Sequence, residues 1–166
     1  MPTLGAILLN PPTSGGLPTL RHLHVAAELL GCDSVVIGNL FATATDDVTA
    51  VNSVGADAAG WTAARPGLLK ALDADVLIAG WGVSGLQGDA QRHREAQVQW
   101  VTASATLRRH VGVWTLNGEP RHPSRWHQYV SDRHGRASGD TQAERLQSVL
   151  VFKTLPWTSA GPAQPG

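Results

Sequence analysis

The chain has 166 residues, of which 42% are hydrophobic and 16% charged, values typical of a single domain with one core. Thirteen Lys and Arg balance thirteen Asp and Glu, and this zero formal net charge excludes a strongly basic nucleic-acid-binding arm and an acidic tail. The single cysteine, Cys32, excludes an internal disulfide and a Cys-rich zinc site. No apolar run is long enough to span a membrane and the first residues do not resemble a signal peptide, so we expect a cytoplasmic protein without membrane contacts.

The charges are unevenly divided between the two halves of the chain. Residues 1–83 contain three Lys and Arg against seven Asp and Glu, whereas residues 84–166 contain ten against six. Five of the seven His also lie in the second half, in short clusters with Arg such as Arg121-His122. These clusters fit a solvated surface, and they also fit a positive mouth that binds a phosphate or an anionic transition state.

The apolar pattern of the first half predicts a strand over 4–9, a helix over 18–30, a strand over 34–38 and a helix over 66–72. The first strand ends at Asn10-Pro11-Pro12, because this segment can continue neither a strand nor a helix. A strand, a helix and a strand within forty residues indicate a parallel unit. The rest of 48–74 is ambiguous.

The second half predicts a strand over 76–80, a helix over 89–109, a strand over 111–116 and a helix over 143–150. The long helix carries apolar residues at helical spacing, which we expect to form its buried face. These residues are Ala96, Trp100, Ala103 and Leu107.

The four predicted strands are short, unbroken apolar runs, as in a sheet that helices cover on both faces. Their alternation with helices predicts a single α/β domain over residues 1–155. We expect a three-layer α/β/α sandwich around a four-stranded parallel sheet in the order 2-1-3-4. Residues 156–166 are expected to form a flexible tail.

Polar and aromatic side chains follow each predicted strand. Asn10 follows the first strand, Asn39 the second and Trp81 the third, and His122 lies in the loop after the fourth. In an open parallel sheet, ligands bind beyond the carboxyl ends of the strands, where neighbouring connections part. The sequence therefore predicts a binding site at this edge.

Four segments carry a resemblance to known families. They are Leu-Leu-Asn10-Pro, Gly-Asn39-Leu-Phe, Gly-Trp81-Gly and Arg-His122-Pro-Ser. In order and spacing, these segments resemble the four signature segments of the uracil-DNA glycosylase superfamily. Over roughly residues 4–130, the chain resembles more closely a family of small uncharacterised bacterial and phage proteins of unknown function, with Asn-Pro, Asn-Leu-Phe-Ala, Trp-Gly and Pro-Arg-His-Pro segments.

The glycosylase resemblance implies a uracil-DNA-glycosylase-like fold and a role for three residues. Asn10 would orient the water that attacks the sugar C1′, Asn39 would read the edge of the base, and His122 would stabilise the departing base. Cleavage through an oxocarbenium-like sugar needs mainly a held water and donors aimed at the leaving base. We therefore expect an N-glycoside hydrolase that acts on a nucleoside, a nucleotide or an unpaired or modified nucleobase, without a metal or other cofactor.

Neighbouring residues of the same segments are expected to bind the substrate, namely Pro11, Phe41, Trp81, Arg121, Ser124, Arg125 and Trp126. The glycosylase superfamily usually places a base-stacking aromatic soon after its first segment, but residues 11–20 contain none. Trp81, Phe41 or Trp126 would have to replace it, although Trp126 also fits a buried position at the sheet edge. Zero net charge favours a free nucleoside or nucleotide over duplex DNA.

A second hypothesis is a module that binds a nucleobase or a nucleic-acid end in the same crevice without catalysis. It is favoured by the neutral side chain of Asn10, which is too weak a base to take a proton from water. Other chemistries match less well. Ser84 lies in a Gly-x-Ser-Gly segment, one residue short of a serine-hydrolase elbow, and no third metal ligand lies beside the pair His22 and His24.

Overall fold

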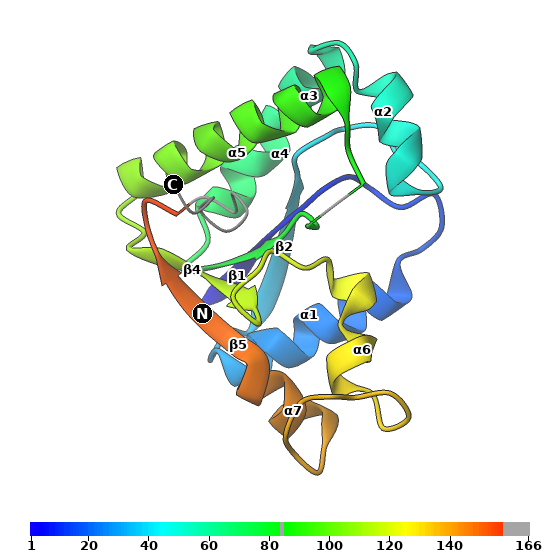
Figure 1. Ribbon diagram of the computed structural model, residues 1–166. Coiled ribbons are helices and arrows are strands. Elements are labelled where there is room, and N and C mark those ends of the chain that lie inside the picture. The colour runs from blue at the N-terminus through cyan, green and yellow to red at the C-terminus, as the bar shows by residue number, and fades with distance from the viewer. Residues whose placement is uncertain (84, 158–166) are drawn as a thin grey trace, which may run out of the picture.

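The computed structural model describes residues 1–83 and 85–157 and contains a five-stranded sheet in the order β2-β1-β3-β4-β5 (Figure 1). The strands are β1 (Thr3–Leu8), β2 (Ser34–Asn39), β3 (Val76–Gly80), β4 (Gly112–Leu116) and β5 (Leu150–Thr154). β1 pairs in parallel with both β2 and β3, and β3 pairs in parallel with β4. β5 is antiparallel to β4, so the sheet is mostly parallel.

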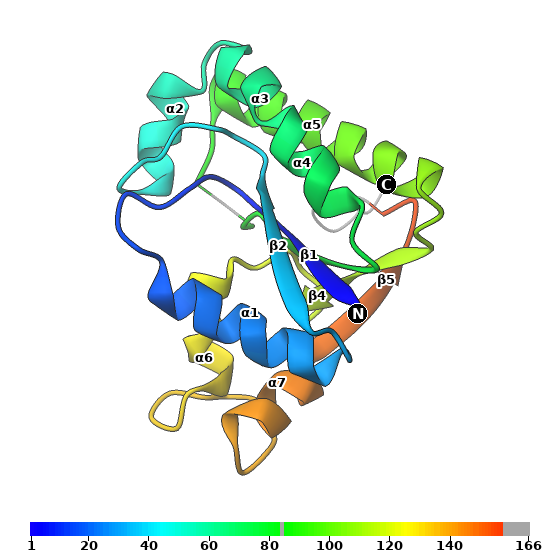
Figure 2. The same cartoon turned by 180° about the vertical axis from the view of Figure 1, so that it is seen from behind.

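Helices cover both faces of this sheet, as Figures 1 and 2 show from opposite sides. The helices are α1 (Leu17–Leu29), α2 (Val51–Val54), α3 (Ala59–Ala63), α4 (Arg65–Leu72), α5 (Gly88–Leu107), α6 (His127–Val130) and α7 (Gln142–Val149). Two short 3-10 turns, η1 (Val48–Ala50) and η2 (Pro123–Arg125), lie in the connecting loops. Helices α2 to α5 lie on one face, and α1, α6 and α7 lie on the other.

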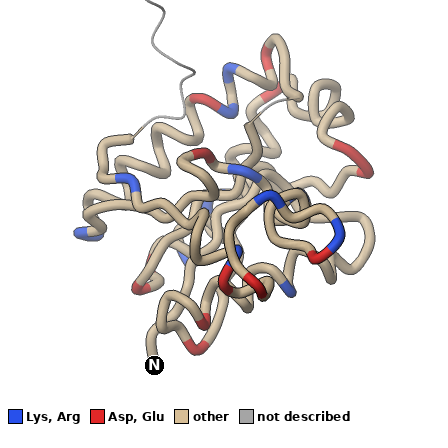
Figure 3. Tube along the Cα trace, turned by 60° about the horizontal axis from the view of Figure 1, so that its bottom comes forward, with Lys and Arg blue, Asp and Glu red and all other residues tan. Residues whose placement is uncertain are grey.

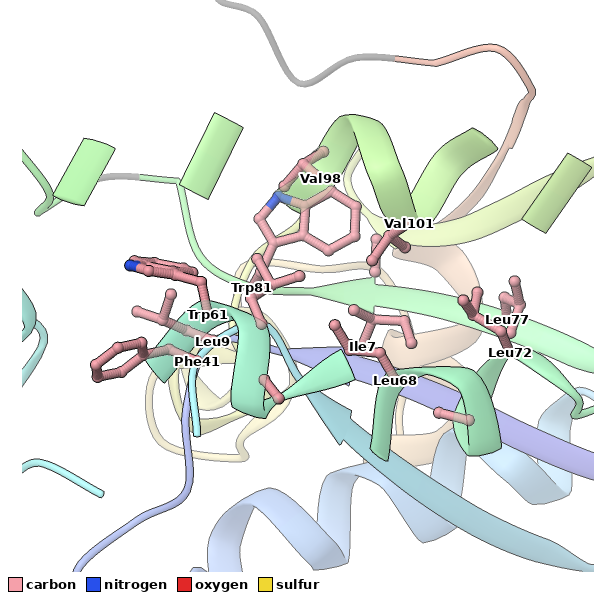
Figure 4. Close-up of a cluster of buried hydrophobic side chains, with 14 of the residues drawn as sticks. Ile7, Leu9, Phe41, Trp61, Leu68, Leu72, Leu77, Trp81, Val98 and Val101 are labelled. Atoms are coloured by element: carbon pink, nitrogen blue, oxygen red, sulfur yellow. The ribbon is translucent and has the colours of Figure 1, made fainter. Parts of the chain in front are cut away.

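Each face of the sheet buries its own cluster of apolar side chains. Because successive residues of a strand point to opposite faces, Leu4 and Leu8 of β1 join the cluster on the α1 side, whereas Ile7 joins the cluster beneath α4 and α5. Figure 4 shows this second cluster, to which α4 contributes Leu68 and α5 contributes Val101. Burial on both faces accounts for the unbroken apolar runs in the sequence.

Helix α4 lies very close to β1 and β2. A Cβ atom built on Gly5 would lie 2.2 Å from the carbonyl oxygen of Ala71, and one built on Gly38 would lie 2.9 Å from the Ala71 Cβ. Both distances are shorter than a packed carbon atom tolerates, so these two positions require glycine. Gly67 on α4 differs, since a Cβ atom added there would meet nothing within 4 Å.

The fifth strand corrects the predicted four-stranded sheet. Residues 150–154 form β5 without any turn after α7, because the helix ends at Val149 and the strand begins at Leu150. No Gly or Pro separates the two elements, so the sequence lacks the usual boundary signal. Phe152 of β5 packs edge-on against Trp114 of β4, with ring centroids 5.3 Å apart.

The predicted buried face of α5 is correct only at Trp100, which is partly buried against the core. Leu107 is 83% exposed, and the helix instead buries Ala90, Gln97, Val98, Val101, Ser104 and Ala105. The polar Gln97 is tolerated there because its Nε2 donates to the carbonyl oxygens of Leu40, at 3.0 Å, and Trp61, at 2.6 Å. Because the polar Gln97 lies within the buried face of α5, a pattern of hydrophobic residues alone does not identify this face.

The predicted tail begins with residues that contact the core. Trp157 packs against the α5-side cluster, and its ring centroid lies 5.9 Å from that of Trp81. Residues 158–166 lie outside the described part of the chain, so the remainder of the tail stays a prediction. Within residues 1–83 and 85–157, no helix is long and apolar enough to cross a membrane.

The close approach of α4 predicts opposite effects for two Gly-to-Ala substitutions. Gly67→Ala should raise the free energy of unfolding by about 0.5–1 kcal/mol, because alanine favours the helix and meets open space. Gly5→Ala should lower it by about 1–3 kcal/mol, because the added methyl group overlaps the Ala71 carbonyl. Urea unfolding of both variants measures the difference, and a stabilised Gly5→Ala protein would contradict the packing described here.

Candidate functional site

A cavity of about 750 Å³ opens at the carboxyl ends of the four parallel strands. Its walls come from the loops that follow β1, β2, β3 and β4 and from the start of α1. Eight of the predicted site residues line it, namely Asn10, Pro11, Asn39, Trp81, Arg121, His122, Ser124 and Arg125. The strand topology therefore brings side chains from distant segments to one cavity.

Hydrogen bonds join the four loops in two pairs. The loops after β1 and β2 are joined by a bridge between Pro12 and Thr45 and by the Thr13 hydroxyl, which donates to Asp46 at 2.8 Å. The loops after β3 and β4 are joined by the Gly82 N–H, which donates to the Pro120 carbonyl at 2.7 Å. Gly82 has a φ of 87°, a conformation that glycine adopts without strain. Residues of both loop pairs line the cavity.

The side chain of Asn10 is held in one orientation. Its amide nitrogen donates to the Thr43 carbonyl at 3.1 Å and to the Thr45 hydroxyl at 2.8 Å. Because a carbonyl can only accept, the atom that faces Thr43 must be Nδ2. The Oδ1 atom of Asn10 has no hydrogen-bond donor among the described residues, so it is an acceptor available to a water or a ligand.

The ring of His122 has a defined tautomer. Its Nδ1 accepts a hydrogen bond from the backbone N–H of Ser124 at 3.2 Å and lies 2.8 Å from the Ser124 hydroxyl. An N–H can only donate, so Nδ1 carries no proton and the neutral ring carries its proton on Nε2. His122 therefore has one N–H free to donate to a ligand in the cavity.

Burial and a neighbouring charge keep His122 neutral. Desolvation and, to a smaller extent, the positive charge of Arg125 together lower the pKa of His122 to about 4. At neutral pH the ring is thus an uncharged hydrogen-bond donor.

The contact between Ser124 and His122 resembles the nucleophile and base of a serine hydrolase, but its chemistry is unsuitable. A side chain with a pKa of about 4 is a weak general base at neutral pH. The Nδ1 lone pair also already accepts from the Ser124 N–H. Ser84, the other serine considered for this chemistry, lies outside the described residues.

Two contacts fix the turn that carries His122. The Nε1–H of Trp126 donates to the Arg121 carbonyl at 2.9 Å. From α1, Nδ1 of His22 lies 2.7 Å from the Pro123 carbonyl, and because a carbonyl can only accept, this nitrogen carries the proton. The turn is thus held at both ends by side chains outside the cavity.

Asn39 is the last residue of β2, where its amide lines the cavity beside Leu8 of β1. Its side chain makes no hydrogen bond to another described residue. The next residue, Leu40, is held by the buried Gln97 through its carbonyl oxygen. The segment is therefore fixed while the carboxamide of Asn39 stays available to a ligand.

The structure does not bring the three aromatic side chains expected to bind substrate together at the cavity. Phe41 and Trp126 are fully buried and do not line the cavity. Trp81 borders the cavity but is only 2% exposed, and its ring lies beneath Val98 of α5 (Figure 4). Phe41 instead packs on Trp61 in the core, with ring centroids 4.9 Å apart.

Charged residues of both signs line the cavity. Of the clustered Arg residues in the second half of the chain, only Arg121 and Arg125 reach it. Asp46 and Asp47 line it as well, and Figure 3 shows basic and acidic positions interspersed along the chain. The positive charge that we expected at the site therefore comes from two arginines.

The sequence reading missed the residues that come from the loop after β2. Thr45, Asp46, Asp47 and Val48 line the cavity, but their run of polar residues indicates only a loop. Their position depends on the contacts of this loop with the loop after β1, which no local pattern encodes. Within the described residues, no group of three His, Cys, Asp or Glu side chains is placed to hold a metal ion.

Residues 1–124 match the model of a protein family described as "Protein of unknown function (DUF1643)". The chain belongs to this family. The match spans most of the chain and confirms the expected membership in an uncharacterised family. No curated protein and no solved structure matches the chain.

The low pKa of His122 predicts a loss of stability in mild acid. In the unfolded chain His122 takes up a proton near its ordinary pKa of 6.5, whereas in the folded protein it does so near 4. The free energy of unfolding should therefore fall as the pH drops from 6.5 towards 4, because only the unfolded state binds the proton there. Urea unfolding at pH 7 and pH 5 measures the fall.

The matched control for this measurement is His122→Gln, which cannot titrate. Its free energy of unfolding should fall less between the two pH values than that of the parent protein. The same dependence on pH in both proteins would rule out a depressed pKa for His122.

Proposed function

We propose that this protein hydrolyses the N-glycosidic bond between sugar and base, either in a nucleoside or nucleotide or at an unpaired or modified nucleobase. The observation that carries the proposal is the meeting of Asn10, Asn39 and His122 at one cavity. Their free groups are an acceptor on Asn10, a carboxamide on Asn39 and an N–H on His122. These are the groups that the resemblance to the uracil-DNA glycosylase superfamily assigns to water, base edge and leaving base.

The cleavage needs no strong base from the protein. The bond between C1′ and the base nitrogen breaks, its electron pair goes to the base, and His122 stabilises the resulting charge by donating from Nε2. Water held by Oδ1 of Asn10 then attacks the cationic C1′ and loses a proton, which the base anion can take up. Orientation by a neutral amide suffices because bond breaking runs ahead of attack.

The volume of the cavity favours a small ligand. About 750 Å³ falls in the range of small-molecule pockets. None of the described lining residues offers the open face of an aromatic ring, so the proposed base would pack against Pro11, Pro12 and Val83. Two arginines at the cavity cannot neutralise an extended duplex backbone.

A non-catalytic nucleobase-binding module is the second candidate. The neutral state of both Asn10 and His122 favours it, because neither side chain is a strong base that could take a proton from water. The two candidates differ in turnover only, and a direct assay separates them.

The proposal is tested by incubating the protein with nucleosides, nucleotides and base-modified oligonucleotides and measuring free base by chromatography. We expect release from at least one substrate, and a decrease of about a hundredfold or more in rate for His122→Ala, the typical effect of removing one such donor. His24→Ala, an exposed histidine on α1 away from the cavity, is the matched control and should keep the parent rate. No release from any substrate, or an unchanged rate in His122→Ala, would reject the hydrolase.

The pH profile of the same reaction provides a further test. Because His122 stays neutral well below its ordinary pKa, the rate should show no inflection near pH 6.5. An inflection there that disappears in His122→Gln would mean that the ring titrates as a general base or acid, contrary to the proposed role.

A further inference from the structure

The two loop pairs that border the cavity carry opposite charges. The loops after β1 and β2 contribute Asp46 and Asp47, which we call the acidic rim. The loops after β3 and β4 contribute Arg121 and Arg125, which we call the basic rim. Each rim is carried by its own hydrogen-bonded loop pair, and both signs of charge line the same cavity.

The charged side chains of the two rims differ in the partners that the protein itself gives them. Asp47 caps η1, where its carboxylate accepts from Thr49 and from the Ala50 N–H, and these bonds lower its pKa. One oxygen of Asp46 accepts from the Thr13 hydroxyl, and the other has no donor among the described residues.

On the basic rim, the guanidinium of Arg121 is paired with Glu119 at 2.6 Å. Arg125 is exposed and has no ion pair within residues 1–83 and 85–157. Within the described part of the chain, Arg125 is thus the arginine of the basic rim without an ion pair, and on the acidic rim Asp46 has fewer hydrogen bonds than Asp47, one against two.

We propose that the ligand of this cavity is a free 5′-mononucleotide with an unsubstituted 3′-hydroxyl, whose phosphate binds Arg125 and whose sugar hydroxyl donates to Asp46. This assignment rests on the proposed function, since it takes the base to lie between Asn39 and His122. Arginine is well suited to phosphate, and a carboxylate is a good acceptor for a sugar hydroxyl.

The acidic rim should also disfavour the binding of a polynucleotide. Inside a nucleic-acid strand every sugar carries one phosphate on its 5′ side and another on its 3′ side. With the first phosphate on Arg125, the second would lie against Asp46, where two negative charges repel each other. A mononucleotide has a hydroxyl at that point, so the same carboxylate attracts the small ligand and rejects the strand.

Binding of isomeric nucleotides to the full chain tests this assignment. The probes are the nucleosides of adenine, guanine, cytosine, uracil and thymine, their 5′-monophosphates and their 3′-monophosphates, with affinities measured by calorimetry. For the preferred base, the 5′-monophosphate should bind about tenfold tighter than the nucleoside, the typical effect of one charge-assisted contact. The 3′-monophosphate, which has the same charge, should bind no tighter than the nucleoside.

Two variants identify the rims, and a third serves as their control. Arg125→Gln should remove the advantage of the 5′-phosphate and leave the affinity for the nucleoside unchanged. Asp46→Asn should improve binding of the 3′-monophosphate. Arg136→Gln, which removes an exposed charge away from the cavity, should change neither value.

The outcomes separate this assignment from the hydrolytic proposal. Equal or tighter binding of the 3′-monophosphate or of a dinucleotide, an unaffected Arg125→Gln protein, or no binding of any probe would overturn the assignment. Tight binding of a 5′-monophosphate without release of free base would support the assignment and reject only the hydrolysis.

Discussion

At the centre of the sheet, Leu8 of β1 pairs with Asn39 of β2 on one side and with Gly80 of β3 on the other. The three strands therefore end at the same level, and their loops leave the sheet at one edge. A slip of one residue would turn every side chain of a strand to the opposite face, and because both faces are buried, such a slip is strongly disfavoured. The register that packs the core thus also sets the positions of Asn10 and Asn39.

Polar groups behind the cavity complete this arrangement. Gln97 of α5 holds the carbonyl of Leu40, and His22 of α1 holds the carbonyl of Pro123, so each helix layer fixes one loop. Trp126 does the same from within its own turn through its indole N–H. These three side chains do not line the cavity, and their contribution is to hold the backbone of the loops that do. The cavity is accordingly built on braced loops, which favours a pre-formed site over one that closes on its ligand.

Much of this molecule can be predicted from local patterns, because short apolar runs mark the parallel strands and residues such as Asn10 and Asn39 mark their ends. The direction in which the aromatic rings point cannot be predicted from local patterns, because it depends on the space in the core and on the hydrogen-bond acceptors near each ring. Trp126 follows the turn of His122, yet its N–H partner inside the protein draws it into the core. Asp46 escapes prediction for another reason, because the pairing of two loops that are distant in sequence brings it to the cavity. Gln97 shows that a single satisfied polar residue can hide the buried face of a long helix.

The family match ends at Ser124, so among the described lining residues only Arg125 lies beyond it, and α6, α7 and β5 also lie outside the matched span. Without β5, the backbone of β4 would form an open border of the sheet. Unpaired strand borders act as templates for strands of other molecules and promote self-association. β5 occupies this border along the whole of β4, and Phe152 covers the Trp114 ring. The last strand thus moves the open border of the sheet from β4 to β5, which carries Lys153, a charged side chain of the kind that discourages pairing with a strand of another molecule.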